Sequence, residues 1–244
     1  MRNIWTICTR ELKHYFISPI AYVVAFIVLI VNGIWFFANI FFATNNPQFI
    51  PGIQNILSPM VILLLFAAPA ITMRSVSEEQ KSGTLELLLT APVRDWELII
   101  GKWMGAFLFL FLILLTTIIY PLILNQLLDP GIDQGLVISY YLGFTLLACA
   151  FVSIGVAISS MFNNQIATFI TTLGVLLILM VSGSASQAIG NSGGELLQYI
   201  DWQEHLYKTF LQGIIELKSI IYYVSLTAVS LFVGTISIET RRWK

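Results

Sequence analysis

Six long apolar segments constrain this chain more than any other feature of its sequence. They cover residues 20–43, 56–72, 103–128, 136–162, 166–184 and 219–238. A helix needs about 20 mostly apolar residues to cross the hydrocarbon core of a bilayer, and none of these segments has an acidic or basic residue near its middle. The sequence therefore predicts an all-α integral membrane protein, with six transmembrane helices in one domain over residues 1–244.

The composition agrees with this class. Charged residues make up 10% of the chain and apolar residues 57%, whereas a soluble domain has about 25% charged residues. The segment 56–72 is short and contains Pro59 and Pro69, so it is either a kinked span or an incomplete one. Cys8 and Cys149 lie in different segments and predict neither a disulfide nor a metal site.

The basic residues are distributed unevenly along the chain. Ten of the 12 Lys and Arg residues fall on one side if six spans alternate: Arg2, Arg10, Lys13, Arg74, Lys81, Arg94, Lys102, Arg241, Arg242 and Lys244. The positive-inside rule then places both termini in the cytoplasm and the chain in the cytoplasmic (inner) membrane. The net charge of −1 argues against nucleic acid as a partner.

Residues 1–18 have the pattern of an amphipathic helix. Ile4, Cys8, Leu12 and Phe16 recur every four residues, and basic residues lie off that stripe. The pattern predicts a helix in the membrane interface, and the alternative is an N-terminal extension of the first span. The pair Ser18–Pro19 predicts a turn into that span.

Residues 185–218 form the longest connection, expected on the outer side. Glycines between positions 190 and 194 predict a loop, and the residues after it predict a helix with Asp201 as its N-cap. The apolar stripe of this helix consists of Trp202, Leu206, Phe210, Ile214 and Leu217. A helix at the outer leaflet and a re-entrant element both fit this pattern.

Residues 74–102 hold the only dense group of charges, which is expected between the second and third spans. Ser77 and Gln80 have the spacing of a capping box, and Gly83 predicts the end of a short helix. Such a helix, held between two spans, could pass force from a soluble partner to the membrane. The alternative is an ordinary solvated loop.

The same residues carry a family resemblance. The run MRSVSEEQKSGTLELLLTAPV at 73–93, followed by WELIIGK at 96–102, resembles the signature of ABC-2 type transporter permeases, and more narrowly their gliding-motility-associated branch. The resemblance extends to residues 18–22, 163–169 and 205–216, and so covers most of the chain.

The resemblance implies a membrane subunit that works with a separate ABC ATPase, and with a second permease copy or a related permease. The implied ATPase contacts are Ser77, Glu78, Glu79, Gln80, Lys81, Gly83, Thr84, Leu85 and Glu86. ATP and Mg would be bound by the partner, and this chain would bind no cofactor and catalyse no reaction. Gly101–Lys102 does not complete a P-loop, because tryptophans occupy both flanking motif positions, 96 and 103.

Three functions remain open at this point. The first is ATP-driven export of an amphipathic or polymeric cargo, and the second is a membrane scaffold that passes ATPase motion to a partner in gliding-type machinery. The third is an energy-independent channel. Co-purification of an ATPase would separate the first two from the third.

Polar and small residues within the spans suggest further contacts. Asn32 and Asn39 share one face of the first span and either line a pathway or make interhelical hydrogen bonds. Gly101 with Gly105, and Gly155 with Ser159, are small residues one helical turn apart, a spacing typical of close helix packing.

Overall fold

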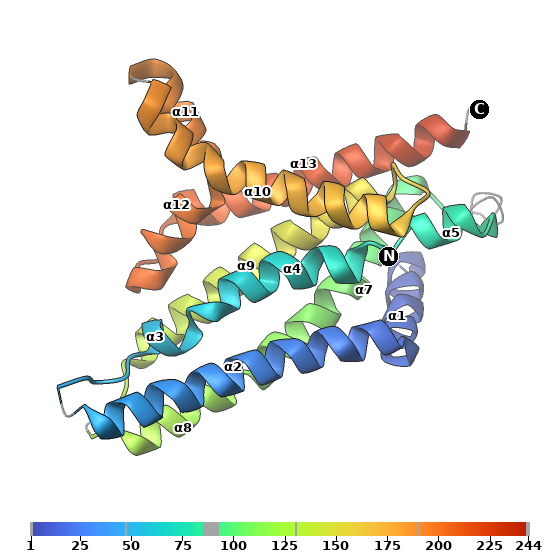
Figure 1. Ribbon diagram of the computed structural model, residues 1–244. Helices are drawn as coiled ribbons and strands as arrows, with labels where there is room; N and C mark the ends of the chain where they lie inside the picture. The colour runs from blue at the N-terminus through green and yellow to red at the C-terminus, as the bar shows by residue number, and fades with distance from the viewer. Residues whose placement is uncertain (1, 47, 85–92, 130, 190, 243–244) are drawn as a thin grey trace.

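The fold is a bundle of helices (Figure 1), known from a computed structural model that describes residues 2–46, 48–84, 93–129, 131–189 and 191–242. The helices of the first half are α1 (Arg2–Ile17), α2 (Pro19–Asn45), α3 (Ile53–Leu57), α4 (Pro59–Thr72), α5 (Ser77–Lys81), α7 (Asp95–Thr116) and α8 (Ile119–Leu127). Those of the second half are α9 (Gln134–Ser159), α10 (Gln165–Ile189), α11 (Asn191–Ile200), α12 (Trp202–Tyr207), the 3-10 turn η1 (Phe210–Gln212) and α13 (Leu217–Arg242). The described residues contain no strand.

Six helical runs are long and apolar enough to cross a membrane. They are Pro19–Asn45, Ile53–Lys81, Asp95–Leu127, Gln134–Ser159, Gln165–Ser184 and Leu217–Thr240. Each coincides with one of the six apolar segments of the sequence, so the prediction of an all-α protein with six helices long and apolar enough to span a membrane is confirmed.

Prolines interrupt two of these runs. α3 and α4 are separated at Ser58, directly before Pro59, and α7 and α8 are separated at 117–118. Thr117 lies four residues before Pro121, where a proline ring clashes with the helical carbonyl. Residues 53–72 number 20 and reach roughly 30 Å at the helical rise, about the thickness of the hydrocarbon core. The second span is therefore kinked but long enough to cross.

The helix α9 occupies the centre of the bundle. In its most apolar stretch 78% of the residues are buried, against 17% for the fifth run at Gln165–Ser184. It packs against α4, α7, α10 and α13, and Phe144 and Phe151 on it are fully buried. A displacement of α9 would therefore change its contacts with four other helices.

The N-terminal helix α1 is separate from the first span. Ser18 has extended backbone angles (φ −75°, ψ 123°), and α2 begins at Pro19 in a different direction, so that α1 lies across one end of the bundle (Figure 1). The predicted turn at Ser18–Pro19 is confirmed, and the alternative of a simple extension of the first span is wrong. An interfacial position for α1 remains a prediction.

The connection 185–218 differs from its prediction in its first part. The expected loop around the glycines is helical, because α10 continues to Ile189 and α11 then folds back against it. Asp201 caps α12 as predicted, since its carboxylate accepts a hydrogen bond from the Gln203 N–H at 2.8 Å. The single helix expected after it ends early, because Gly213 (φ +80°) closes η1.

Both termini of the described chain lie at the same end of the bundle as α1 and α5, and α11 and α12 extend at the opposite end (Figure 1). This placement follows from an even number of crossings. The assignment of the α1–α5 end to the cytoplasm rests on the positive-inside rule and remains a prediction.

Candidate functional site

The short helix α5 is fastened to the end of the central helix α9. The Ser159 hydroxyl oxygen accepts hydrogen bonds from the backbone N–H groups of Val76 at 2.9 Å and Ser77 at 3.1 Å. The Gln80 side chain donates to the Ser160 carbonyl at 2.7 Å. These bonds are sheltered from water, and buried N–H groups need such partners, so they hold α5 firmly against α9.

The start of α5 differs from the predicted capping box. Val76 occupies the N-cap, and Ser77 lies inside the helix, where its hydroxyl donates to the Met73 carbonyl. Ser159 supplies from another helix the acceptor that a capping hydroxyl would provide, and Gln80 reaches away to Ser160. The predicted end of the helix is confirmed, because α5 stops at Lys81 and Gly83 has a φ of +72°.

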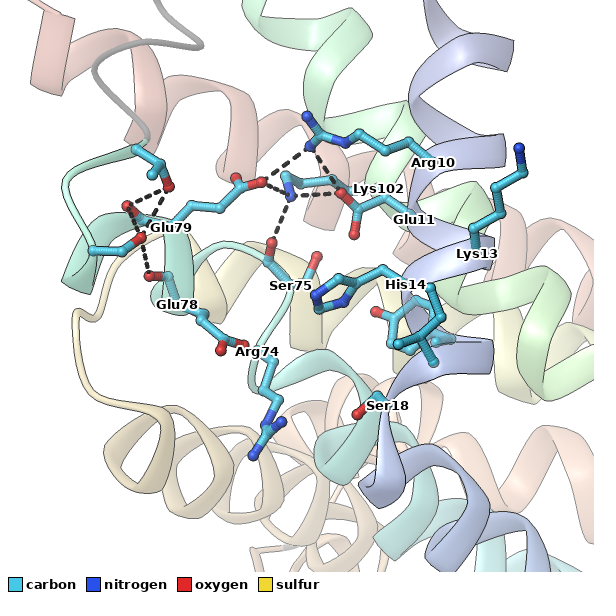
Figure 2. A pocket seen from close by; sticks show the side chains of 14 residues that line it. Arg10, Glu11, Lys13, His14, Ser18, Arg74, Ser75, Glu78, Glu79 and Lys102 are labelled. Carbon is cyan, nitrogen blue, oxygen red and sulfur yellow. Dashed lines mark hydrogen bonds and ion pairs between the residues drawn. The ribbon is translucent and has the colours of Figure 1, made fainter.

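Four charged side chains from three helices meet beside α5 (Figure 2). The Lys102 ammonium of α7 lies 3.0 Å from Glu11 Oε1 of α1 and 2.9 Å from Glu79 Oε1 of α5. Arg10 of α1 contacts the same two oxygens, at 3.1 Å and 3.0 Å. We call Arg10, Glu11, Glu79 and Lys102 the charge cluster. Its two positive and two negative charges balance.

Lys102 is the most deeply buried member of the charge cluster, with 1% of its side chain exposed. It also donates to the Ser75 carbonyl at 2.6 Å, in the link between α4 and α5. A charge so far from water is tolerated only when it is paired and hydrogen-bonded. The ammonium therefore ties α7, α1 and the α4–α5 link to one point.

The charge cluster also shifts the ionisation of Glu11. Burial opposes ionisation of this carboxyl, but the Lys102 ammonium and the Arg10 guanidinium outweigh that effect and hold the pKa of Glu11 below its ordinary value. Glu11 is consequently a carboxylate at neutral pH, as the ion pairs require.

Two glycines of α7 allow α1 to approach closely enough for these pairs. A Cβ on Gly101 would lie 2.7 Å from Ile7 Cγ2, and a Cβ on Gly105 would lie 2.6 Å from the Cβ of Glu11. Real carbon atoms do not approach so closely, so both positions need glycine for this packing. The expectation that Gly101 and Gly105 mark a packing contact is confirmed, with α1 as the partner.

The other small pair also marks a contact. Gly155 of α9 packs directly on the Thr72 side chain at the end of α4, and Ser159, one turn further on, is the acceptor for α5. The sequence predicted close packing here, but it did not predict that Ser159 would hold α5.

A pocket of about 540 Å³ opens between α1 and the α4–α5 link (Figure 2). We call it the α1–α5 pocket. Its lining residues are Arg10, Glu11, Lys13, His14, Tyr15, Ile17, Ser18, Arg74, Ser75, Glu78, Glu79, Ser82, Thr84 and Lys102. The pocket thus brings the basic residues of the N-terminal helix next to the charged residues that follow the second span.

The ATPase contacts that the resemblance implied fall into three groups. Ser77 is buried. Glu78, Glu79 and Gln80 are half-buried, and the side chains of Glu79 and Gln80 are bonded within the chain. The exposed members are Lys81, Gly83 and Thr84. Leu85 and Glu86 lie outside the described residues.

Asn32 and Asn39 do not behave alike. Asn32 is buried and donates to the Val28 carbonyl at 2.8 Å and to the Met60 sulfur at 3.6 Å on α4. Asn39 is half-buried and donates to the carbonyl of Trp35 in its own helix. Only Asn32 therefore makes a hydrogen bond between helices.

At the opposite end, His205 lies in an aromatic cluster. Its ring stacks on Tyr222 with centroids 4.1 Å apart, and its Nε2 lies 3.0 Å from the Tyr199 carbonyl. Burial lowers the pKa of this imidazole, so it packs as a neutral group. Across the described residues, no group of three or more His, Cys, Asp or Glu side chains could hold a metal ion.

Sequence reasoning missed Glu11 and Lys102 as partners. Glu11 stands three residues after Cys8 and four before Tyr15, and both of these are buried, so it falls on the packed face of α1. An acidic residue on an apolar stripe was the available signal. A buried carboxylate needs a cation as its partner, so this signal predicts a buried cation elsewhere in the chain.

Comparison with known proteins gives one family. No curated protein matches the chain, but a family model described as "ABC-2 family transporter protein" matches residues 31–242. The match includes all of α5, α7, α9 and the described part of the loop that carries the implied ATPase contacts, and it does not distinguish the gliding-motility branch. With six helices able to cross a membrane and a family match over most of its length, the chain belongs to the ABC-2 family of transporter proteins.

Proposed function

We propose that this chain is the permease subunit of an ABC transporter, and that it couples ATP hydrolysis by a separate ATPase to export of an amphipathic or polymeric cargo. ATP and Mg are bound by the ATPase. The observation that carries the proposal is the attachment of α5 to α9, α7 and α1 at the same end of the bundle. Because α5 is held by three helices, a displacement of α5 is transmitted to all of them.

The surface offered to the ATPase consists of the exposed residues at the end of α5. Lys81, Ser82, Gly83 and Thr84 are exposed, and Glu78 is half-buried. Ser77, Glu79 and Gln80 belong to the same interface but act from inside, because their side chains fix α5 to the rest of the chain. Leu85 and Glu86, the next two implied contacts, lie outside the described residues.

Motion of α5 has two routes into the membrane domain. One runs through the hydrogen bonds to Ser159 and Ser160 at the end of α9, which packs on four other helices. The other runs from Glu79 through Lys102 to α7. The two routes move the central helix and the third span together.

A second permease copy, or a related permease, would complete the pathway. The first and fifth helical runs have the fewest buried residues, 22% and 17% of their most apolar stretches, so their sides remain open to lipid or to another subunit. The apolar, uncharged spans suit a cargo that is itself amphipathic or extended.

The test is a pull-down of the full chain in mild detergent, followed by mass spectrometry of the bound proteins. We expect an ABC ATPase to co-purify and to be lost when the double variant Glu78→Lys, Lys81→Glu reverses the charges of the exposed surface. Asp129→Lys is the matched control, because Asp129 is exposed in the connection between α8 and α9, away from α5.

Two results would contradict the proposal. One is a stable, folded chain that brings down no ATPase. The other is an ATPase that remains bound to the charge-reversed variant and whose activity still depends on this chain. A permease without cargo-stimulated ATPase activity would favour the scaffold over export.

A further inference from the structure

We propose that the α1–α5 pocket binds a phosphate-bearing anion, either the headgroup of an anionic phospholipid or free phosphate. The pocket shares Glu78, Ser82 and Thr84 with the surface proposed for the ATPase, but its test measures anion binding to this chain alone. The proposal rests on the volume of the pocket, the charges of its lining and a buried donor without a partner.

The charges of the lining leave cations available. The charge cluster uses Arg10 and Lys102 to balance Glu11 and Glu79. Outside it the lining has the cations Lys13 and Arg74 against one acid, Glu78, and it also contains the imidazole of His14. The cations therefore exceed the acids by one.

Neither of these two cations is paired within the described part of the chain. Lys13 and Arg74 make no ion pair there, and the Arg74 Nε lies buried without a hydrogen-bond partner. A buried guanidinium donor normally has an acceptor, and a phosphate oxygen is the acceptor that arginine binds most strongly.

The position of the pocket fits a headgroup. Ser18 and Ile17, where α1 turns into the first span, form part of its wall, and Ile17 is 79% exposed. Figure 2 shows Lys13 and His14 on the α1 side and Arg74 on the side of the α4–α5 link. A lipid could thus place its phosphate at the Arg74 guanidinium and its acyl chains along the apolar surface of α2. Basic pockets on the cytoplasmic side of spans bind anionic headgroups in this way.

The experiment is calorimetric titration of the full chain in an uncharged detergent with three probes. They are short-chain phosphatidylglycerol, inorganic phosphate, and diacylglycerol with the same chains. We expect saturable binding of a phosphate-bearing probe, weakened about tenfold in Arg74→Gln, because a charged hydrogen bond is lost. Lys81→Gln is the matched control: Lys81 is an exposed cation close by that does not line the pocket.

The probes identify the source of the anion. Binding of phosphatidylglycerol but not of inorganic phosphate supports a lipid headgroup. Binding of both probes, weakened equally by Arg74→Gln, supports a site for phosphate itself. The proposal is overturned if neither binds, if Arg74→Gln binds as well as the native chain, or if Lys81→Gln weakens binding equally. Should Arg74→Gln fold poorly, Arg74→Lys replaces it, since it keeps the positive charge but removes the unpartnered Nε donor and should also weaken binding.

Discussion

Lys102 shows how much depends on single residues at the α1–α5 end. Its ammonium is shielded from water and has three oxygen partners, contributed by α1, α5 and the α4–α5 link. Such a group fixes geometry because, without it, Glu11 and Glu79 would keep only the half-exposed Arg10 as a counter-ion.

We expect Lys102→Met to lower the free energy of unfolding by about 3 kcal/mol, because Glu11 and Glu79 would lose their buried counter-ion. Denaturant unfolding in detergent measures this change. Lys208→Met is the control: Lys208 pairs with Glu204 but is 60% exposed, and a surface pair contributes under about 1 kcal/mol. Equal effects in the two variants would show that the cluster adds nothing specific.

The stability of the chain should fall in acid because of Glu11. Its pKa is lower in the folded state than in the unfolded chain, so the folded state binds this proton less tightly. The contribution is fully present above the unfolded value of about 4.3 and is lost as the pH falls through the lower folded-state value. Unfolding measured across this range should therefore be less pH-dependent in Glu11→Gln than in the native chain. Glu216→Gln, at an exposed position, should follow the native curve, and parallel curves for all three would contradict the prediction.

At the scale of the elements, the docking of α1 on α7 depends on the two glycines. Gly105→Ala should push α1 away from α7, because the added Cβ would meet the Cβ of Glu11, with a cost of about 1–3 kcal/mol. Cys8 is fully buried in the native chain, so its labelling by a thiol reagent, in a Cys149→Ala background, should become faster in this variant. Gly174→Ala, where a Cβ meets nothing within 4 Å, should leave the labelling rate unchanged. Unchanged labelling in Gly105→Ala would show that α1 tolerates the added carbon.

The attachment of α5 to α9 can be tested at Ser159. In Ser159→Ala the N–H groups of Val76 and Ser77 lose their acceptor, so we expect faster hydrogen exchange across α5 and weaker coupling to the ATPase. The stability cost should be about 1–3 kcal/mol. Ser153→Ala is the matched control, since Ser153 is buried in the same helix but bonds only to Ala150 of that helix. Exchange that rises equally in both variants would mean that α5 is held by other contacts.

Much of the fold was predictable from local pattern, whereas the site was not. Apolar length predicts each span, and Pro59 correctly predicts a kink. The helix α11 was missed because its glycines suggest a loop, yet Gly194 is buried where α11 folds back against α10. The charge cluster joins residues 69 and 91 positions apart, a separation that no helical or strand period reports.

For the whole molecule, the arrangement predicts that the two ends of the bundle lie on opposite sides of the membrane. In a chain with Cys8 and Cys149 replaced by alanine, a membrane-impermeant thiol reagent should label Asp129→Cys in intact cells. It should label Lys81→Cys only after lysis, because α5 is expected in the cytoplasm. Labelling of both from the same side would contradict the six-span topology with cytoplasmic termini.

The docking of α1 on α7 also sets the order in which parts of the protein can assemble. Arg10 and Glu11 leave the ribosome early, whereas Gly101, Lys102 and Gly105 follow about 90 residues later in the sequence. Until the third span has been inserted, the N-terminal helix lacks the glycine surface of α7, and Glu11 lacks the buried ammonium of Lys102. Its docking on α7 is therefore a late event in biosynthesis, and a nascent chain that ends before the third span would lack this contact.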